Sequence, residues 1–270
     1  MPSSKPAKSA KATKSPAVVR ADKIRVATDD GPGAEPVIRE VPWPRIGPKA
    51  ALIQIGACGV CGTDQHILKG HWPKPLPWPF TLGHELAGKI VEIGADLKAD
   101  HMGKAIGVGS KLMLPPLMPC GFCDWCKRYP EQSNKCLTPV YYGRYLGFDK
   151  PPHLWGGWAE YVYVDLEELP GTKIYKLPDD MSYRLGSLSE PVTSCIRAFN
   201  RAARAGGFKW GDTVVIQGTG PIGILAIAAE YCLRNYTRIR MMQLEALVMS
   251  VHPCSPIIWS YLMSKFCNCF

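Results

Sequence analysis

The stretch VVIQGTGPIGILAIAAE, residues 214–230, has an apolar β-type run, then a glycine-patterned turn, then a helix of small residues. Strand, turn and helix in this order open a βαβ unit. Gly218 permits the tight turn, Gly220 lets the backbone approach a pyrophosphate, and Gly223 allows close packing of helix on strand. The residues expected to contact a dinucleotide are Gly218, Gly220, Pro221, Ile222 and Gly223. A glycine-rich turn without a ligand is the alternative interpretation.

Residues 231–270 do not continue this pattern, because they have no clean period of 2 or 3.6. A doubly wound domain has about six strands, and an acidic residue about 20 positions after the glycines holds the ribose. Glu245 is a late candidate for that acid, whereas Arg238 or Arg240 would favour a 2′-phosphate. We therefore expect a Rossmann domain that is truncated after its first βα unit. Residues 231–270 are interpreted as an alternative C-terminus, a product of altered splicing or a shifted frame, or a diverged interaction segment; we favour the second.

The composition is typical of a soluble globular protein, with 46% apolar and 20% charged residues in a chain of 270. Part of the net charge of +9 lies in residues 1–20, which we expect to be a disordered basic tail. A transit peptide and an anion-binding arm are the alternatives for this tail. The sequence has neither an apolar stretch of 18 residues nor a nucleic-acid pattern of basic and aromatic residues. We expect a cytoplasmic protein with no membrane span and no nucleic-acid partner.

The region from residue 21 to 186 reads as a β-rich domain of short strands separated by glycine and proline. Its apolar run 50–55 leads into a glycine- and cysteine-rich turn, and residues 71–80 form an irregular loop that contains four prolines. At Ser187 the pattern changes, because SEPVTSCIRAFNRAARA has helical spacing. The expected organisation is a β-rich catalytic domain at 21–186, the start of a Rossmann domain at 187–230 and an atypical tail at 231–270.

Four cysteines within 17 residues form the strongest metal signal. In CGFCDWCKRYPEQSNKC three cysteines stand two residues apart and a fourth follows, which gives one closed tetrahedral zinc site with no open position. Such a site is structural. The alternative is a group of buried or disulfide-linked cysteines. The four candidate ligands are Cys120, Cys123, Cys126 and Cys136.

A second cluster surrounds Cys61 and His84, a soft thiolate and an imidazole of the mixture that suits zinc. Asp64 and Glu85 are carboxylates beside these two residues and could orient them. Thr63 and His66 form a hydroxyl and imidazole pair that could pass a proton outwards.

The segments GVCGTDQH and GHELAGKIVEIG resemble the zinc-binding medium-chain alcohol and polyol dehydrogenases. This resemblance implies an α/β chain with a GroES-like catalytic domain, two zinc ions and NAD or NADP. It implies a catalytic zinc on Cys61, His84 and Glu190, with Glu85 as an outer-shell or alternate ligand. Cys195, His71 and His153 are rivals for the third position. One departure is that nine residues separate Cys126 from Cys136, where the family usually has seven.

By this resemblance, the expected function is hydride transfer between NAD(P) and an alcohol of polyol, sugar or amino-alcohol type. Thr63 would take the alcohol proton and relay it to His66. One alternative is a catalytically inactive, truncated zinc-binding product that pairs with full-length subunits. Another is a binding protein for small molecules or nucleic acid. The expected partner is a small-molecule alcohol, and a homo-oligomer stays open.

Overall fold

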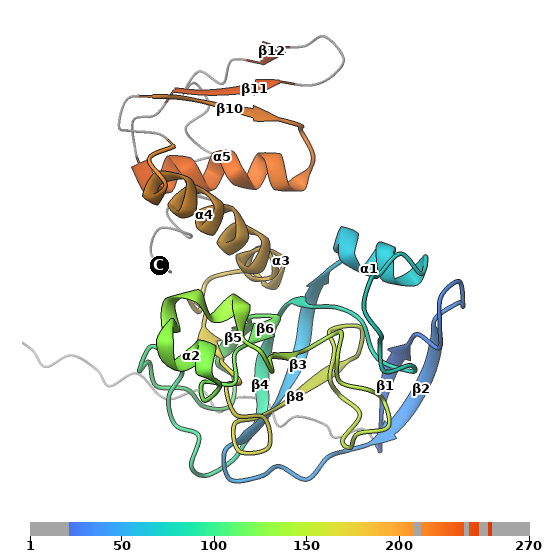
Figure 1. Cartoon of the computed structure of the whole chain (residues 1–270). Helices are drawn as coiled ribbons and strands as arrows, with labels where there is room; N and C mark the ends of the chain where they lie inside the picture. The colour runs from blue at the N-terminus through green and yellow to red at the C-terminus, as the bar shows by residue number, and fades with distance from the viewer. Residues whose placement is uncertain (1–21, 208–211, 235–237, 243–247, 250–270) are drawn as a thin grey trace, which may run out of the picture.

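The computed structural model describes residues 22–207, 212–234, 238–242 and 248–249. A β-rich part is followed along the chain by an α/β part that begins with helices α3 and α4 (Figure 1). The α/β class expected from the sequence is confirmed. The basic tail expected at residues 1–20 lies outside the described residues.

A five-stranded antiparallel sheet forms the centre of the β-rich part, with strand order β8-β3-β4-β5-β9. Its strands coincide with the apolar runs of the sequence: β3 (Ala50–Gly59), β4 (Glu85–Ile93), β5 (Lys111–Leu114), β8 (Tyr161–Asp165) and β9 (Tyr175–Lys176). The predicted turn directly after residue 55 is wrong, since β3 continues to Gly59. Pairing with β4 extends the strand, with Cys58 opposite Leu86 and Gly59 opposite Glu85.

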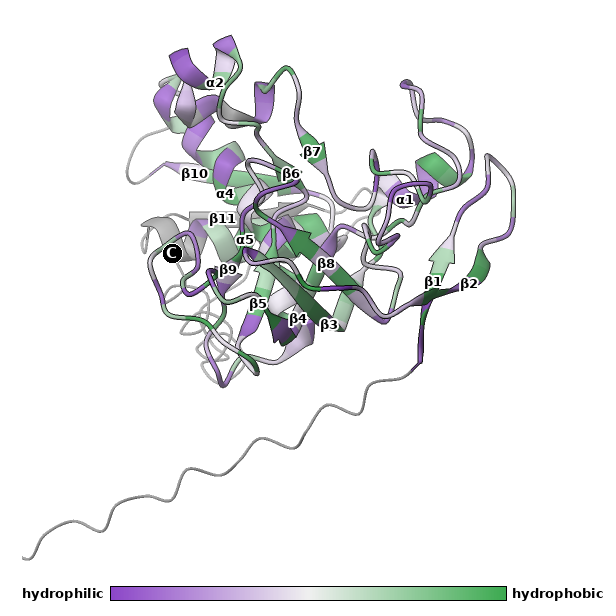
Figure 2. Ribbon diagram, turned by 90° about the horizontal axis from the view of Figure 1, so that it is seen from below, coloured by the Kyte–Doolittle hydropathy of each residue, from purple (hydrophilic) through white to green (hydrophobic). Residues whose placement is uncertain are grey.

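The main hydrophobic core lies on this sheet. Side chains of Leu52, Ile53, Ile90, Leu112 and Val162 are fully buried. Figure 2 shows the apolar colour on the central strands β3 and β4. Burial of these branched side chains on a pleated surface explains why the runs form strands.

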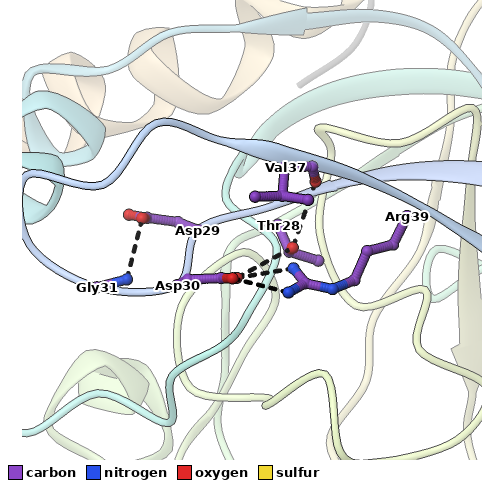
Figure 3. A network of polar contacts seen from close by, with 6 residues as sticks. All are labelled: Thr28, Asp29, Asp30, Gly31, Val37 and Arg39. Carbon is purple, nitrogen blue, oxygen red and sulfur yellow. Dashed lines mark hydrogen bonds and ion pairs between the residues drawn. The ribbon is translucent and has the colours of Figure 1, made fainter.

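An antiparallel ribbon of β1 (Lys23–Thr28) and β2 (Val37–Pro42) borders the sheet. Figure 3 shows how its connection is held: Arg39 donates two hydrogen bonds of 2.7 Å to the carboxylate of Asp30. The Thr28 hydroxyl donates to the Val37 carbonyl at 3.3 Å, and the Gly31 amide donates to Oδ1 of Asp29 at 3.3 Å. The chain turn is therefore fixed by side chains on both of its arms.

A small lobe projects between two short paired strands. Leu117 of β6 (Leu117–Met118) lies opposite Tyr141 of β7 (Val140–Tyr141). The chain between them contains α2 (Asp124–Arg128) and the 3₁₀ segment η1 (Pro130–Lys135). A second short helix, α1 (Gly62–Leu68), follows β3 at another position on the sheet (Figure 1).

The α/β part begins with α3 (Tyr183–Ser187) and α4 (Ser189–Arg204), and α4 confirms the helix expected after Ser187. Strand β10 (Thr213–Gln217), helix α5 (Pro221–Arg234) and strand β11 (Arg238–Met242) follow. Because β10 and β11 are parallel neighbours, these three elements complete one βαβ unit. The short strand β12 (Val248–Met249) pairs with β11 antiparallel, and Glu245 lies outside the described residues.

Helices α4 and α5 pack against each other and connect the two parts. Val192, Cys195, Leu225 and Ala229 are buried in one cluster, which includes Ala87 of β4. This contact places the first turn of α4 beside the beginning of β4. Among the described residues, no helix is long and apolar enough to cross a bilayer.

Candidate functional site

The first candidate centre gathers a thiol, an imidazole and a carboxylate. One ligand atom each from Cys61, His84 and Glu85 lies within 4.8 Å of the others. Pairing of β3 with β4 sets Gly59 opposite Glu85, so the turn that leads to Cys61 lies beside the start of β4. His84 is buried, whereas Cys61 and Glu85 are half-buried. Catalytic zinc sites use these three ligand types.

A buried carboxylate stands behind two of these groups. Oδ1 of Asp64 lies 3.3 Å from Nδ1 of His84, and Oδ2 of Asp64 accepts a hydrogen bond of 2.8 Å from the Cys61 amide. Both side chains are buried, with exposed fractions of 0% for Asp64 and 4% for His84. A carboxylate at Nδ1 fixes the orientation of the imidazole and leaves the other ring nitrogen for a metal.

The charges of the cluster favour a thiolate. A hydrogen bond from His84 lowers the pKa of Cys61, burial opposes this effect, and the amide and hydroxyl of Thr63 add to the lowering. Burial acts to lower the pKa of His84, but Asp64 and Cys61 outweigh it and raise the value to about 9. Burial raises the pKa of Glu85. A cation would favour the deprotonated form of all three groups.

Glu190 lies in the first turn of α4 but outside the set whose ligand atoms are within 4.8 Å. Burial raises the pKa of Glu190, while the nearby charge of His84 lowers it and that of Glu85 raises it. Its carboxylate therefore interacts with the same cluster. Among the described residues Cys195 is in no group of potential metal ligands, and its Sγ lies 3.7 Å from the Ile222 carbonyl oxygen of α5.

The other two rivals have separate environments. Nδ1 of His153 lies 2.6 Å from the Phe148 carbonyl oxygen. His71 is exposed, and its ring centroid lies 6.1 Å from that of His66. Among the described residues, neither belongs to a group of potential metal ligands.

Thr63 and His66 lie three residues apart on α1, a spacing that sets them on one face of the helix. Thr63 is half-buried and its hydroxyl interacts with the Cys61 thiol, whereas His66 is exposed. The pair thus leads from the cluster towards solvent.

Arg144 is a further residue of this neighbourhood that the sequence analysis did not single out. Its charge lowers the pKa values of both His84 and Glu190. The guanidinium carbon lies 5.1 Å from the ring centroids of Trp72 and of Tyr141.

The second candidate centre is the cysteine lobe. The four sulfur atoms of the residues predicted as its ligands lie within 4.8 Å of one another: Cys120, Cys123, Cys126 and Cys136. All four are free thiols. Backbone amides of Cys120, Cys123 and Cys126 donate to sulfur atoms of the cluster at 3.3–3.5 Å. Amide donors of this kind stabilise thiolates, so the four-sulfur set fits a closed zinc site despite the nine-residue gap.

The glycine turn joins β10 to α5. Gly218 has φ of 106°, in the left-handed region that favours glycine. A Cβ at Gly223 would lie 2.1 Å from the Gly218 carbonyl oxygen, whereas a Cβ at Gly220 would meet nothing within 4 Å. The turn is thus closed at Gly223 and open at Gly220, as a pyrophosphate-binding loop requires.

Residues 47–179 match the family described as the alcohol dehydrogenase GroES-like domain. These residues are a domain of this family. The β-rich part is therefore an alcohol dehydrogenase GroES-like domain. It contains both the cluster of thiol, imidazole and carboxylate and the cysteine lobe. A Rossmann-type βαβ unit follows it along the chain. The resemblance to zinc-binding medium-chain dehydrogenases is confirmed.

One relative of this chain is the scyllo-inosose 3-dehydrogenase of Thermotoga maritima, with 35% identity over 205 residues. The alignment covers 71% of this chain and 48% of that enzyme. The chain therefore spans about half the length of the curated relatives it matches.

Solved structures agree with the assignment. An alcohol dehydrogenase from Thermotoga maritima has a TM-score of 0.71 and 26% identity, covering 81% of this chain and 57% of the other. A Sinorhizobium meliloti structure, described as a zinc-binding dehydrogenase bound to NADP, has a TM-score of 0.65 and 29% identity. That match covers 82% of this chain and 56% of the other.

Proposed function

We propose that the chain takes part in zinc-dependent oxidation of an alcohol, with NAD or NADP as hydride acceptor. The observation that carries the proposal is the set of Cys61, His84 and Glu85 ligand atoms within 4.8 Å, with Asp64 behind His84. The inosose substrate named for the Thermotoga maritima relative supports a polyol or sugar-like alcohol as substrate. An amino alcohol is the third class that the family resemblance allows.

Zinc fits this donor set, which combines one thiol, one imidazole and one carboxylate around a buried histidine. Cys61, His84 and Glu85 would hold the ion, and Glu190 is available as an alternate carboxylate ligand. When bound, zinc supplies a Lewis acid that lowers the pKa of an alcohol oxygen. A closed site on the four lobe cysteines would hold a second ion and stabilise the lobe.

The protein groups supply orientation and proton transfer. Asp64 would orient the His84 ring, whose Nδ1 lies 3.3 Å from Oδ1, and it accepts a hydrogen bond from the Cys61 backbone amide. The Thr63 hydroxyl would accept the alcohol proton, and the exposed His66 would pass it to solvent. The relay runs outwards along one face of α1, which supports its direction.

A nicotinamide cofactor fits the turn between β10 and α5. The open face at Gly220 allows backbone approach to a pyrophosphate, and the first turn of α5 presents free N–H groups to it. Pro221 and Ile222 begin that helix. A bound nicotinamide would supply the hydride acceptor.

The test uses the full chain purified with zinc. We expect about two zinc ions per chain by elemental analysis, a thermal shift with millimolar NAD+ or NADP+, and reduction of the cofactor with a panel of inositols and polyols. Cys61→Ala should lose one zinc and the alcohol oxidation, whereas Cys195→Ala is the matched control and should keep both.

Two results would contradict the proposal in different ways. A zinc content of one per chain that Cys61→Ala leaves unchanged would refute the catalytic metal site. Two zinc ions without any nucleotide binding would retain the metal site but refute hydride transfer by this chain.

A further inference from the structure

We infer that Arg144 anchors an anionic group of the substrate, so that the chain selects an alcohol that carries a phosphate or carboxylate over a neutral one. This inference rests on the proposed function, because it assigns the substrate class of the same site.

Backbone contact sets Arg144 next to the metal cluster. Gly143, with φ of 72°, packs against Gly83, and a Cβ at Gly143 would lie 2.3 Å from the Gly83 carbonyl oxygen. His84 directly follows Gly83, and Arg144 directly follows Gly143. The tight contact between Gly83 and Gly143 therefore brings the two residues that follow them close together. These are His84, a candidate metal ligand, and Arg144.

Aromatic rings hold the guanidinium. Its carbon lies over the rings of Trp72 and Tyr141, at 5.1 Å from each centroid. The Trp72 indole donates a hydrogen bond of 3.1 Å to the Tyr145 hydroxyl, and Tyr145 packs edge-on against Tyr141. Stacking uses the faces of a guanidinium and leaves its in-plane N–H donors available for a planar or tetrahedral anion.

One of those donors, Nε, has no hydrogen-bond partner in the described part of the chain. Nε of Arg144 is buried without a hydrogen bond, and no carboxylate of the described residues lies within 4.0 Å of the guanidinium. A buried donor without a partner is costly, and arginine does not lose its charge. A ligand anion would satisfy the donor and the charge together.

The nearby carboxylates are not these partners. The charge of Arg144 lowers the pKa of Glu190, but among the described residues these two side chains form no ion pair. Glu85 has its carboxylate in the metal-ligand set. With zinc bound, Glu85 would be one of its ligands, so the guanidinium is left for a group that arrives with the substrate.

The experiment compares three small alcohols that differ in charge: glycerol, glycerol 3-phosphate and glycerate. Binding to the zinc-loaded full chain is measured by calorimetry. We expect one or both anionic compounds to bind at least tenfold more tightly than glycerol. Arg144→Gln should reduce that preference roughly tenfold to a hundredfold. Arg197→Gln, which removes an exposed arginine of α4, should bind all three compounds like the wild type.

Zinc content and melting temperature accompany each titration. Preference for glycerol 3-phosphate alone assigns a phosphate, and preference for glycerate alone assigns a carboxylate. Equal binding of all three compounds by a wild type with two zinc ions overturns the inference and leaves the proposed function standing. An Arg144→Gln protein that is folded, zinc-loaded and unchanged in preference also overturns it. Absence of zinc from the Cys61 cluster refutes the proposed function and this inference with it.

Discussion

Asp64 contacts two residues of the candidate metal centre. Its Oδ1 lies 3.3 Å from Nδ1 of His84, and its Oδ2 accepts a hydrogen bond of 2.8 Å from the Cys61 amide. One buried carboxylate therefore lies between an imidazole that directly precedes β4 and a thiol that directly precedes α1. The geometry of the centre depends on this side chain, although Asp64 is not itself in the ligand set.

We expect Asp64→Asn to reduce zinc affinity at this centre by about 10- to 100-fold, because the amide cannot hold the His84 imidazole as a carboxylate does. Competition with a chelator measures the affinity. Asp96→Asn, at an exposed position, is the control and should leave it unchanged. Wild-type affinity in Asp64→Asn would show that the carboxylate does not orient the histidine.

Cys123→Ser should release one zinc ion per chain and lower the melting temperature. A hydroxyl is a poor substitute for a thiolate in a four-sulfur site, and metal binding contributes to the stability of such a lobe. The second zinc ion should remain, since the Cys61 cluster forms a separate group. Loss of both ions together would contradict two independent centres.

Gly143→Ala should destabilise the protein by about 1–3 kcal/mol, because it combines a left-handed backbone with a clash against Gly83. Gly103→Ala separates the two effects. Gly103 has φ of 78°, but a Cβ there would meet nothing within 4 Å. Urea unfolding measures both variants, and an equal loss of stability would mean that the contact with Gly83 contributes nothing.

The two ends of the glycine turn should respond differently to alanine. Gly223→Ala should lower stability, since its Cβ would lie 2.1 Å from the Gly218 carbonyl oxygen. Gly220→Ala should leave the melting temperature unchanged but weaken binding of NAD+ or NADP+, because its methyl group would occupy the open approach to a pyrophosphate. Undiminished nucleotide binding by folded Gly220→Ala would exclude this turn as the binding loop.

Asp29 and Asp30 should have opposite effects on the pH dependence of stability. Burial raises the pKa of Asp29, so the folded state holds its proton longer than the unfolded state, and stability falls as pH rises past the ordinary pKa of 3.8. Hydrogen bonds from Arg39 lower the pKa of Asp30, so its contribution is present above 3.8 and is lost as pH falls below that value.

Urea midpoints between pH 3 and 7 test this pair. Asp29→Asn should reduce the loss of stability on raising the pH, and Asp30→Asn should reduce the loss on lowering it. The same slope in both variants would contradict the assignment.

Much of the architecture could be predicted from the sequence. The apolar runs predicted the strands of the sheet. The glycine turn, with the strand before it and the helix after it, predicted the beginning of a βαβ unit. The four lobe cysteines were predicted because their spacing is local. The extension of β3 to Gly59 could not be predicted, because glycine and cysteine there resemble a turn, and only pairing with β4 keeps the segment extended.

The spacing of residues in the sequence also cannot decide whether Glu85 or Glu190 is the third candidate metal ligand. Both acids stand in motifs, but their distances to Cys61 depend on the register of β3 with β4, which shifts at two irregularities, and on the packing of α4. Arg144 was missed since YYGRY matches no motif. The sequence shows only a glycine before an arginine among tyrosines. The position of Arg144 beside the cluster follows from the contact of Gly143 with Gly83, which is distant in the sequence.

The cysteine lobe lies between β6 and β7, and the strand that closes it contains Tyr141, one of the rings against Arg144. The ends of the lobe are thus tied to the platform on which the guanidinium rests. Oxidation or metal loss at the four thiols would therefore act on a strand that carries one of the rings against Arg144.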